Sequence, residues 1–508
     1  MSIIKPFSII FLLGLFGRLI GYLRDFAYAF FLGTNIVSDI LLIIVRAYAI
    51  IQISLGQKYF YSPFIKFFVS IKERNTSSLK ELTFTKNIFY LFLVPISIIF
   101  ILLEIYLPNI INFFFKNLDF KNYDLIIICL RIILPIMVLS FTSSILIGIL
   151  HSNLKFSAVA FTPIILNLFI ILFMFISNFS SISILVLISL GFLFGTIVQT
   201  IFLFYFSKIK IIFYGGSKFK FGNDEKNFVY VVLPSIFVGF LILINNNLIA
   251  MYFGSAQAGN ISYIYFANRF SHILVDIYGI ALGTVLMPHI SKAIIKKDFE
   301  LTNKLIANSI KILFFGLLPA CFGVFYLSDS LIYLFFERGA FNDISTANTS
   351  LLLRGYVPGV VALCLSSILM TLYFALSKTK LLVIITLTYT LISYFLLKIL
   401  YDQFDIAGIG YGTSISAWIF VLILYVGIKK EQIFKISFEF LSFFFRSFFY
   451  SSLMIITLVI LNNYISFDRN YMLVFMVCSG VIFYCLMILL FEKKISKSVF
   501  MYLRKINL

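Results

Sequence analysis

Apolar runs of about twenty residues recur along this 508-residue chain, and they constrain its fold more than any other feature. A helix that crosses the hydrocarbon core of a bilayer needs about 20 mainly apolar residues. Hydrophobic residues make up 61% of the sequence and charged residues only 12%, and the mean hydropathy is +1.06. A water-soluble core could not bury this much apolar surface, so the sequence predicts a polytopic membrane protein.

The predicted fold class is all-α integral membrane, with about fourteen transmembrane helices. A backbone in lipid must satisfy its own hydrogen bonds, which leaves helices and closed barrels. A barrel would show short alternating segments, whereas these runs are continuous. The predicted spans are 8–30, 35–57, 86–108, 124–150, 157–178, 181–207, 228–253, 260–290, 306–328, 346–375, 381–401, 408–428, 444–463 and 470–491.

The basic residues between the spans favour one orientation. Alternate loops together with both termini hold 27 lysines and arginines, and the opposite loops hold 4. Basic residues accumulate on the cytoplasmic side of membrane proteins, so both termini are predicted to be cytoplasmic. The net charge of +19 then reflects topology. No soluble basic domain is present to suggest nucleic-acid binding.

Several classes of function lack their sequence signals. No loop is long enough for a soluble domain, and no GxxxxGK[ST] motif suggests ATP-driven transport by this chain alone. The five cysteines and three histidines lack metal-ligand spacing, so neither a metal site nor a cofactor is expected. The first apolar run carries Arg18, Arg24 and Asp25 and precedes no small-residue cleavage site, which argues against a cleaved signal peptide.

Charged residues inside predicted spans mark a candidate site. Each costs about 2.5–3.5 kcal/mol at bilayer depth on insertion scales. Arg18 and Asp25 are seven residues apart, about two helical turns, and so share one face of the first span. Two arginines and one aspartate there suggest a water-filled cavity for an anionic ligand. Arginine suits phosphate because its planar fork donates two parallel hydrogen bonds.

Other charges extend this pattern along the chain. Asp39 begins the second span, Arg46 follows two turns later, and Arg269 adds a cation to the eighth span. Arg131 and Arg354 lie near predicted span ends. For these two we expect a structural role, either snorkelling to the membrane interface or pairing with a neighbouring acid.

Five stretches, in order along the chain, carry recognisable motifs. They are GRLIGYLRDFAYAFFLGTNIVSD (17–39), NLKFSAVAFTPIILN (153–167), YFANRF (265–270), GIALGTVLMPHIS (279–291) and LFFERGAF (334–341). These stretches resemble the MurJ (MviN) family of lipid II flippases. The family's first helix contains a G-x-x-RD segment followed by FG and an Asp, and its later segments have the forms F-x-x-P-A-F-x-P, YYADR, GVALGT and RG-x-F. The resemblance covers nearly all of the chain, with a matching number of spans and the same orientation.

The resemblance implies the fold of the multidrug/oligosaccharidyl-lipid/polysaccharide exporter superfamily. Two six-helix lobes, 1–215 and 226–430, would surround a central cavity, and two extra helices in 440–495 would form a lipid-tail groove. The implied protein is a transporter of the bacterial inner membrane, not an enzyme. It would move lipid II by alternating access and meet membrane lipids and cell-wall synthesis proteins as partners.

The resemblance also implies roles for individual residues. The family's cavity cations fall on Arg18, Arg24 and Arg269 and its acid on Asp39, which are the expected substrate-binding residues. Asp25 and Arg46 are expected to support these residues or to gate the cavity.

The chain departs from the family pattern at several positions. Gln52 stands where the family has a basic residue, and Gln57 and Asn268 stand where it has acids. The energy source and any ion coupling therefore stay open. Two alternatives also remain: a flippase for another polyprenyl-pyrophosphate oligosaccharide or a cation-coupled exporter of the same superfamily, and a non-transporting membrane scaffold for envelope synthesis.

Overall fold

The computed structural model describes residues 4–492 with gaps. The gaps are 57, 75–77, 115–119, 154, 208–221, 256, 281–285, 287–289, 291–292, 295–296, 377, 430–437 and 466–467. Throughout the described part every regular element is helical, as the sequence predicts. Eleven of the described helical segments are long and apolar enough to cross a membrane.

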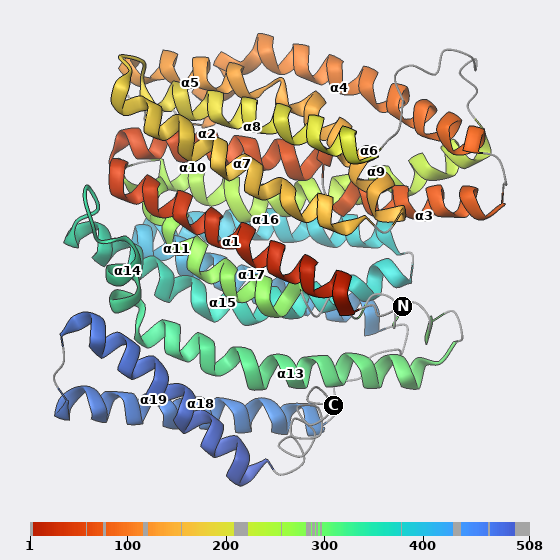
Figure 1. Ribbon diagram of the computed structural model, residues 1–508. Coiled ribbons are helices and arrows are strands. Elements are labelled where there is room, and N and C mark those ends of the chain that lie inside the picture. Colours follow the sequence, from red (N-terminus) through yellow and green to blue (C-terminus); the bar gives the residue numbers. More distant parts are fainter. Residues whose placement is uncertain are drawn as a thin grey trace. The chain divides into compact units, whose positions relative to one another are not determined.

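Figure 1 traces these helices in chain order. They are α1 (Ile4–Leu32), α2 (Ile36–Gly56), α3 (Lys58–Arg74), α4 (Ser78–Phe114), α5 (Phe120–Ile133), α6 (Ile136–Ser152), α7 (Phe156–Ile176), η1 (Ser177–Phe179), α8 (Ile184–Ser207), α9 (Asn223–Leu243), η2 (Ile244–Ile249), α10 (Ala250–Gly254), α11 (Asn260–Leu274), η3 (Val275–Ile280), α13 (Phe299–Tyr326), α14 (Ser328–Phe336), α15 (Asp343–Ala375), α16 (Thr379–Phe404), α17 (Ile406–Lys429), α18 (Phe438–Tyr464) and α19 (Arg469–Phe491). Each predicted span is mostly helical over its described part.

Two helices lie where the sequence predicts loops. α3 occupies most of the first long predicted loop, 58–86, and α14 lies between the ninth and tenth predicted spans. Phe60, Phe64 and Phe68 of α3 recur every fourth residue and are buried, which makes this helix amphipathic. Its polar positions lower its mean hydropathy, so a search for apolar runs does not find it.

The predicted span 124–150 is interrupted. α5 ends at Ile133, Pro135 lies in a turn, and α6 begins at Ile136. Proline has no N–H for the helical ladder and its ring clashes with the preceding turn. This span is therefore two helical segments rather than one.

The chain forms two compact units, of which the first comprises Met1–Ser262 and Arg338–Phe341. Within it, α7 packs against α8 and α1, while α6 packs against α8, α2 and α3. Phe228 of α9 is fully buried in a nest of aromatic rings. Its neighbours are Phe60, Phe64 and Phe67 of α3, and Phe84 and Phe92 of α4.

The second unit comprises Tyr263–Glu337 and Asn342–Leu508. α15 lies at its centre and packs against α17, α13, α14 and η3. α18 and α19 lie beside α13 (Figure 1), where Phe315, Tyr450 and Tyr484 share one apolar cluster and Leu327 and Leu458 share another. The two last helices are thus attached to the bundle through α13 and α14.

The two compact units divide the chain later than the lobes expected from the resemblance. The first unit extends to Ser262 because α9 packs on α2, α3 and α4. The lobes 1–215 and 226–430 stay a prediction about which parts move together.

Candidate functional site

Arg24 is the best-defined predicted site residue. It lies on α1, where its Nε and Nη2 atoms donate to Asp25 Oδ1 at 3.1 and 2.7 Å. Its Nη1 donates to Asn167 Oδ1 at 2.9 Å, and its guanidinium lies 5.5 Å from the ring centre of Tyr28. The Arg24 side chain is only 13% exposed and that of Asp25 is fully buried. These contacts hold the guanidinium in one orientation inside the first unit.

Asn167 of α7 is a site residue that the sequence analysis did not single out. It is buried and reaches Arg24 across 143 residues of chain. The available signal was a polar side chain within the otherwise apolar run that follows Pro163. Asn167 ends the second family-like stretch, but nothing in the sequence indicates which charge it contacts.

The structure gives fewer contacts for the other predicted arginines. Arg18 belongs to α1, but its side chain lies outside the described residues. Arg46 of α2 and Arg269 of α11 are half-buried. Arg24 belongs to the first compact unit and Arg269 to the second. Their convergence on one cavity therefore stays a prediction.

Asp39 holds the first turn of another helix. Its buried carboxylate accepts the backbone N–H of Gly259 at 2.6 Å and of Ser262 at 2.8 Å, and the Ser262 hydroxyl at 2.5 Å. α11 begins at Asn260, and Gly259 has no side chain to cap it. Asp39 of α2 supplies this cap, and its negative charge suits the positive end of the helix dipole.

The turn after α1 and the segment Arg338–Phe341 are in backbone contact. Gly33 and Gly339 have φ angles of +60° and +63°, which favour glycine. The N–H of Ala340 donates to the carbonyl of Phe30 at 3.1 Å. A Cβ at Gly33 would lie 2.3 Å from the Ala340 oxygen, and one at Gly339 would lie 2.4 Å from the Phe30 oxygen. Only glycine permits this approach.

Gln52, which replaces a basic residue of the family, has a local partner. Its side-chain amide donates to the hydroxyl of Tyr48 at 2.7 Å, one helical turn away. The Tyr48 ring packs against Phe192 of α8, with ring centroids 4.5 Å apart. This part of α2 is therefore neutral where the family pattern carries a charge.

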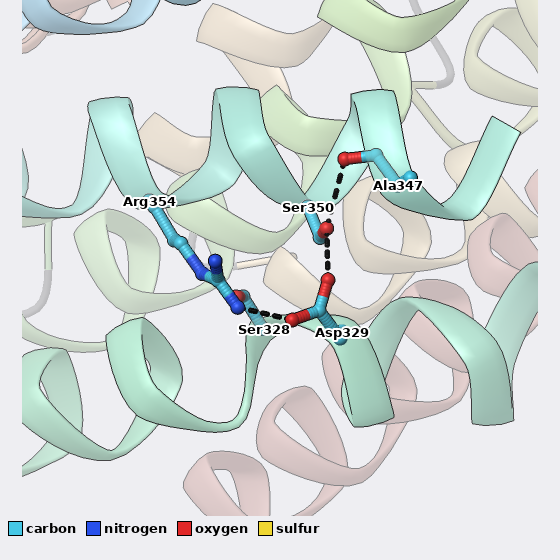
Figure 2. A network of polar contacts seen from close by, with 5 residues as sticks. All are labelled: Ser328, Asp329, Ala347, Ser350 and Arg354. Atoms are coloured by element: carbon cyan, nitrogen blue, oxygen red, sulfur yellow. Dashed lines mark hydrogen bonds and ion pairs between the residues drawn. The ribbon is translucent and has the colours of Figure 1, made fainter. Parts of the chain in front are cut away.

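Arg131 and Arg354 each pair with a neighbouring acid, which is one of the two placements expected for them. Arg131 Nε contacts Glu104 Oε1 at 2.9 Å. Figure 2 shows the carboxylate of Asp329 on α14 between Ser350 and Arg354 of α15. Arg354 Nε also donates to Ser328 Oγ at 2.7 Å. The contacts of Ser328 and Asp329 with Ser350 and Arg354 join α14 to α15.

The described site residues combine an arginine with a carboxylate and an amide. Among the described residues no three His, Cys, Asp or Glu side chains gather as metal ligands. None of the five cysteines, all of them described, forms a disulfide bond, and Cys129, Cys321 and Cys364 are buried. Arg24 is held by one carboxylate and one amide, an arrangement that orients a guanidinium for hydrogen bonding to an oxyanion.

Comparison with known sequences identifies the family. The profile of the family described as Lipid II flippase MurJ matches residues 28–478. A probable lipid II flippase MurJ of Rickettsia prowazekii is 29% identical over 359 residues, which are 69% of each chain. Another, from Buchnera aphidicola of Acyrthosiphon pisum, is 27% identical over 440 residues, covering 84% of this chain and 83% of the relative.

Comparison with solved structures supports the fold. A structure titled lipid II flippase MurJ in an inward closed conformation superposes with a TM-score of 0.80 at 24% identity, covering 96% of this chain and 99% of that one. An inward-facing multidrug resistance MATE family transporter of the MOP superfamily gives a TM-score of 0.64 at 14% identity, covering 84% and 98%. With a family profile that matches most of its length, this chain belongs to the lipid II flippase MurJ family, whose members are transporters and not enzymes.

Proposed function

We propose that this chain moves the head group of lipid II from the cytoplasmic to the outer face of the bacterial inner membrane by alternating access. The observation that carries the proposal is the oriented, nearly buried Arg24 within an apolar bundle. Lipid II carries a pyrophosphate that cannot cross hydrocarbon unaided. A fixed guanidinium recognises such a group through two parallel charge-assisted hydrogen bonds.

Arg18 and Arg269 would share the charge of the pyrophosphate with Arg24. Asp25 partly neutralises Arg24, so the site needs further cations to favour a doubly charged ligand. Arg46, half-buried on α2, is a further candidate for a supporting role. Release at the outer face requires a second conformation that binds the head group more weakly.

Asp39 would help to gate the cavity rather than bind the ligand. Its carboxylate already accepts three hydrogen bonds from the start of α11, the helix that carries Arg269. The glycine contact between the end of α1 and Arg338–Phe341 would close the same side of the molecule. Opening outward would require both contacts to separate, which couples the arginine positions to the state of the gate.

The resemblance assigns a different role to each part of the chain. The lobes 1–215 and 226–430 would rock against each other, and the two helices in 440–495 would hold the polyprenyl tail. Both termini would be cytoplasmic. Cell-wall synthesis proteins would use the lipid at the outer face. Support comes from the basic residues on alternate loops and from the separate packing of α18 and α19 on α13.

The test is complementation of a bacterium depleted of its lipid II flippase. Arg24→Ala should lower rescue at least about tenfold at equal membrane abundance, since lost hydrogen bonds to a charged group cost more than 1.4 kcal/mol. Arg24→Lys should restore only part, because lysine keeps the charge without the fork. Lys304→Gln, which removes an exposed pair with Glu300, is the control and should rescue fully.

The same experiment separates the alternatives. Full rescue by an abundant Arg24→Ala variant would remove the pyrophosphate-binding role and favour a scaffold. If the native chain fails to rescue while purified protein in vesicles moves another polyprenyl-pyrophosphate oligosaccharide, the cargo differs. Movement of an organic cation instead would indicate a cation-coupled exporter.

A further inference from the structure

A second oriented arginine lies in the part of the chain formed by the two last helices. Arg446 of α18 donates through Nε and Nη2 to Ser442 Oγ at 3.2 and 2.8 Å. Its Nη1 donates at 3.1 Å to Oε1 of Glu492, the residue that follows α19. The guanidinium also lies 5.3 Å from the ring centre of Phe443. These three partners fix the orientation of the Arg446 side chain.

This arrangement repeats the one found at Arg24 on α1. In both cases Nε and Nη2 donate to one side-chain oxygen, Nη1 donates to a second, and an aromatic ring lies beside the guanidinium. In both cases one of the two oxygens belongs to a carboxylate. The exposure differs, since the side chain of Arg24 is 13% exposed and that of Arg446 is 49% exposed. A ligand can therefore reach Arg446 from outside the bundle.

Arg446 keeps donors that its partners do not use. A guanidinium has five N–H donors, and the bonds to Ser442 and Glu492 use three of them. The described residues supply no hydrogen bond to the other two, one on each terminal nitrogen. Glu492 is buried and also accepts the hydroxyl of Tyr450, so its carboxylate serves to hold Arg446. The exposed donors are suited to an oxyanion.

Lys311 of α13 adds a second cation. Its Nζ lies 4.4 Å from the ring centre of Phe443, the ring that Arg446 also contacts. Ser447, the residue after Arg446, donates to the carbonyl of Phe314 at 2.8 Å, one helical turn beyond Lys311. This bond fixes α18 and α13 at the same level. Two cations stand beside one buried acid, so the cluster carries a net positive charge.

The cluster lies at the depth of lipid head groups. The candidate span Ser442–Tyr464 begins four residues before Arg446, about 6 Å along the helix, and the candidate span Tyr471–Phe491 ends just before Glu492. The distribution of basic residues predicts that this end is cytoplasmic. Basic pockets between membrane helices on that side bind phosphate-bearing head groups. Phe449, 59% exposed, follows on the same face of α18 and offers apolar surface to a lipid chain.

We propose that Arg446 and Lys311 bind the phosphate of a lipid in the cytoplasmic leaflet, with Ser442 and Glu492 as positioning residues. The chain of that lipid lies along α18 beside Phe449. Two lipids share this chemistry: a polyprenyl pyrophosphate and an anionic phospholipid. The polyprenyl case rests on the proposed function, and there the site gives the substrate a place to bind that is separate from Arg24.

The test counts lipids retained by the purified chain in detergent, by native mass spectrometry, with undecaprenyl pyrophosphate or phosphatidylglycerol added. Arg446→Ala should lower retention at least fivefold, and Lys311→Gln about threefold. Lys304→Gln, which removes an exposed ion pair on the same helix as Lys311, is the control and should retain lipid as the native chain does.

Glu492→Gln separates a phosphate site from a structural ion pair. The glutamine oxygen still accepts from Arg446, while the loss of the negative charge favours an anion. Retention should therefore rise at least twofold. A structural ion pair predicts instead that Arg446→Ala and Glu492→Gln change retention in the same direction. A fall in both variants would overturn the proposal.

Competition between the two added lipids at equal concentration identifies which of them the site prefers. The loss from Arg446→Ala should add to the loss from Arg24→Ala, because separate sites act independently. Native retention of both lipids by Arg446→Ala and by Lys311→Gln would remove this site. That result leaves the role of Arg24 intact, because rescue of a flippase-depleted bacterium tests transport separately.

Discussion

At the scale of single residues, the site depends on how one arginine is held. Arg24 and Asp25 are adjacent in sequence, and their pairing follows from one helix. Asn167 joins them only because α7 packs against α1. A guanidinium bonded on two sides loses less rotamer freedom when it binds a ligand, which favours affinity. Positioning of Arg24 thus depends on a second helix.

Asn167→Leu should therefore weaken transport without removing a charge. We expect a loss of roughly threefold to tenfold in complementation, equivalent to a hydrogen bond worth about 0.5–1.5 kcal/mol. Thr162→Val on the same helix is the matched control, since the Thr162 hydroxyl bonds only to the carbonyl of Val159 in its own turn. If Asn167→Leu lowers transport further in an Arg24→Ala background, its effect does not act through Arg24.

At the scale of elements, helix ends decide how segments meet. α11 takes its N-terminal cap from Asp39 of α2, and the turn after α1 meets Arg338–Phe341 through two glycines. α9 is fixed by Phe228 inside rings from α3 and α4. Each junction joins distant parts of the sequence through a small group of atoms.

Gly339→Ala should destabilise the contact between the α1 turn and Arg338–Phe341. The left-handed φ costs an L-residue roughly 1–2 kcal/mol, and the added Cβ meets the Phe30 carbonyl. We expect a lower thermal unfolding midpoint in detergent and reduced transport. Gly323→Ala in α13 is the control, because nothing lies within 4 Å of its added Cβ. Equal midpoints for the two variants would show that the contact contributes little.

Phe228→Ala should remove the centre of the aromatic nest. Deleting a buried phenylalanine costs about 3–5 kcal/mol, so the unfolding midpoint of the purified chain should fall clearly. Tyr230→Ala on the same helix is the comparison, since Tyr230 is 69% exposed and faces away from the nest. A similar midpoint for both variants would contradict the role of this cluster in fixing α9.

At the scale of the whole molecule, charge distribution along the chain predicts orientation in the membrane. Cytoplasmic loops retain lysine and arginine during insertion, and 27 basic residues against 4 is a strong bias. α3 belongs to the predicted cytoplasmic side, and α14 with the Arg354–Asp329 network to the outer side.

Cysteine labelling in intact cells measures this orientation. In a Cys478→Ser, Cys485→Ser background, Ile344→Cys, at a position 67% exposed, should react with an impermeant maleimide from outside. Lys80→Cys should react only after the membrane is permeabilised. Labelling of Lys80→Cys in intact cells would reverse the predicted topology.

Residue chemistry alone determined the membrane class, the helical spans and the presence of costly arginines. These properties are local: a span needs only its own twenty residues, and a charge is costly wherever it meets lipid. The sequence alone does not distinguish Gly33 and Gly339 from the other glycines. It does not distinguish Asn167 from the other polar residues either. The partners of Gly33 and Gly339 are 307 and 309 residues away along the chain, and that of Asn167 is 143 residues away, so only tertiary packing could assign them. The same is true of Asp39, which caps a helix that begins more than two hundred residues later. The meeting of Lys311 and Arg446 at one aromatic ring also required the structure, because a helical sequence does not indicate which of its faces the neighbouring helices cover.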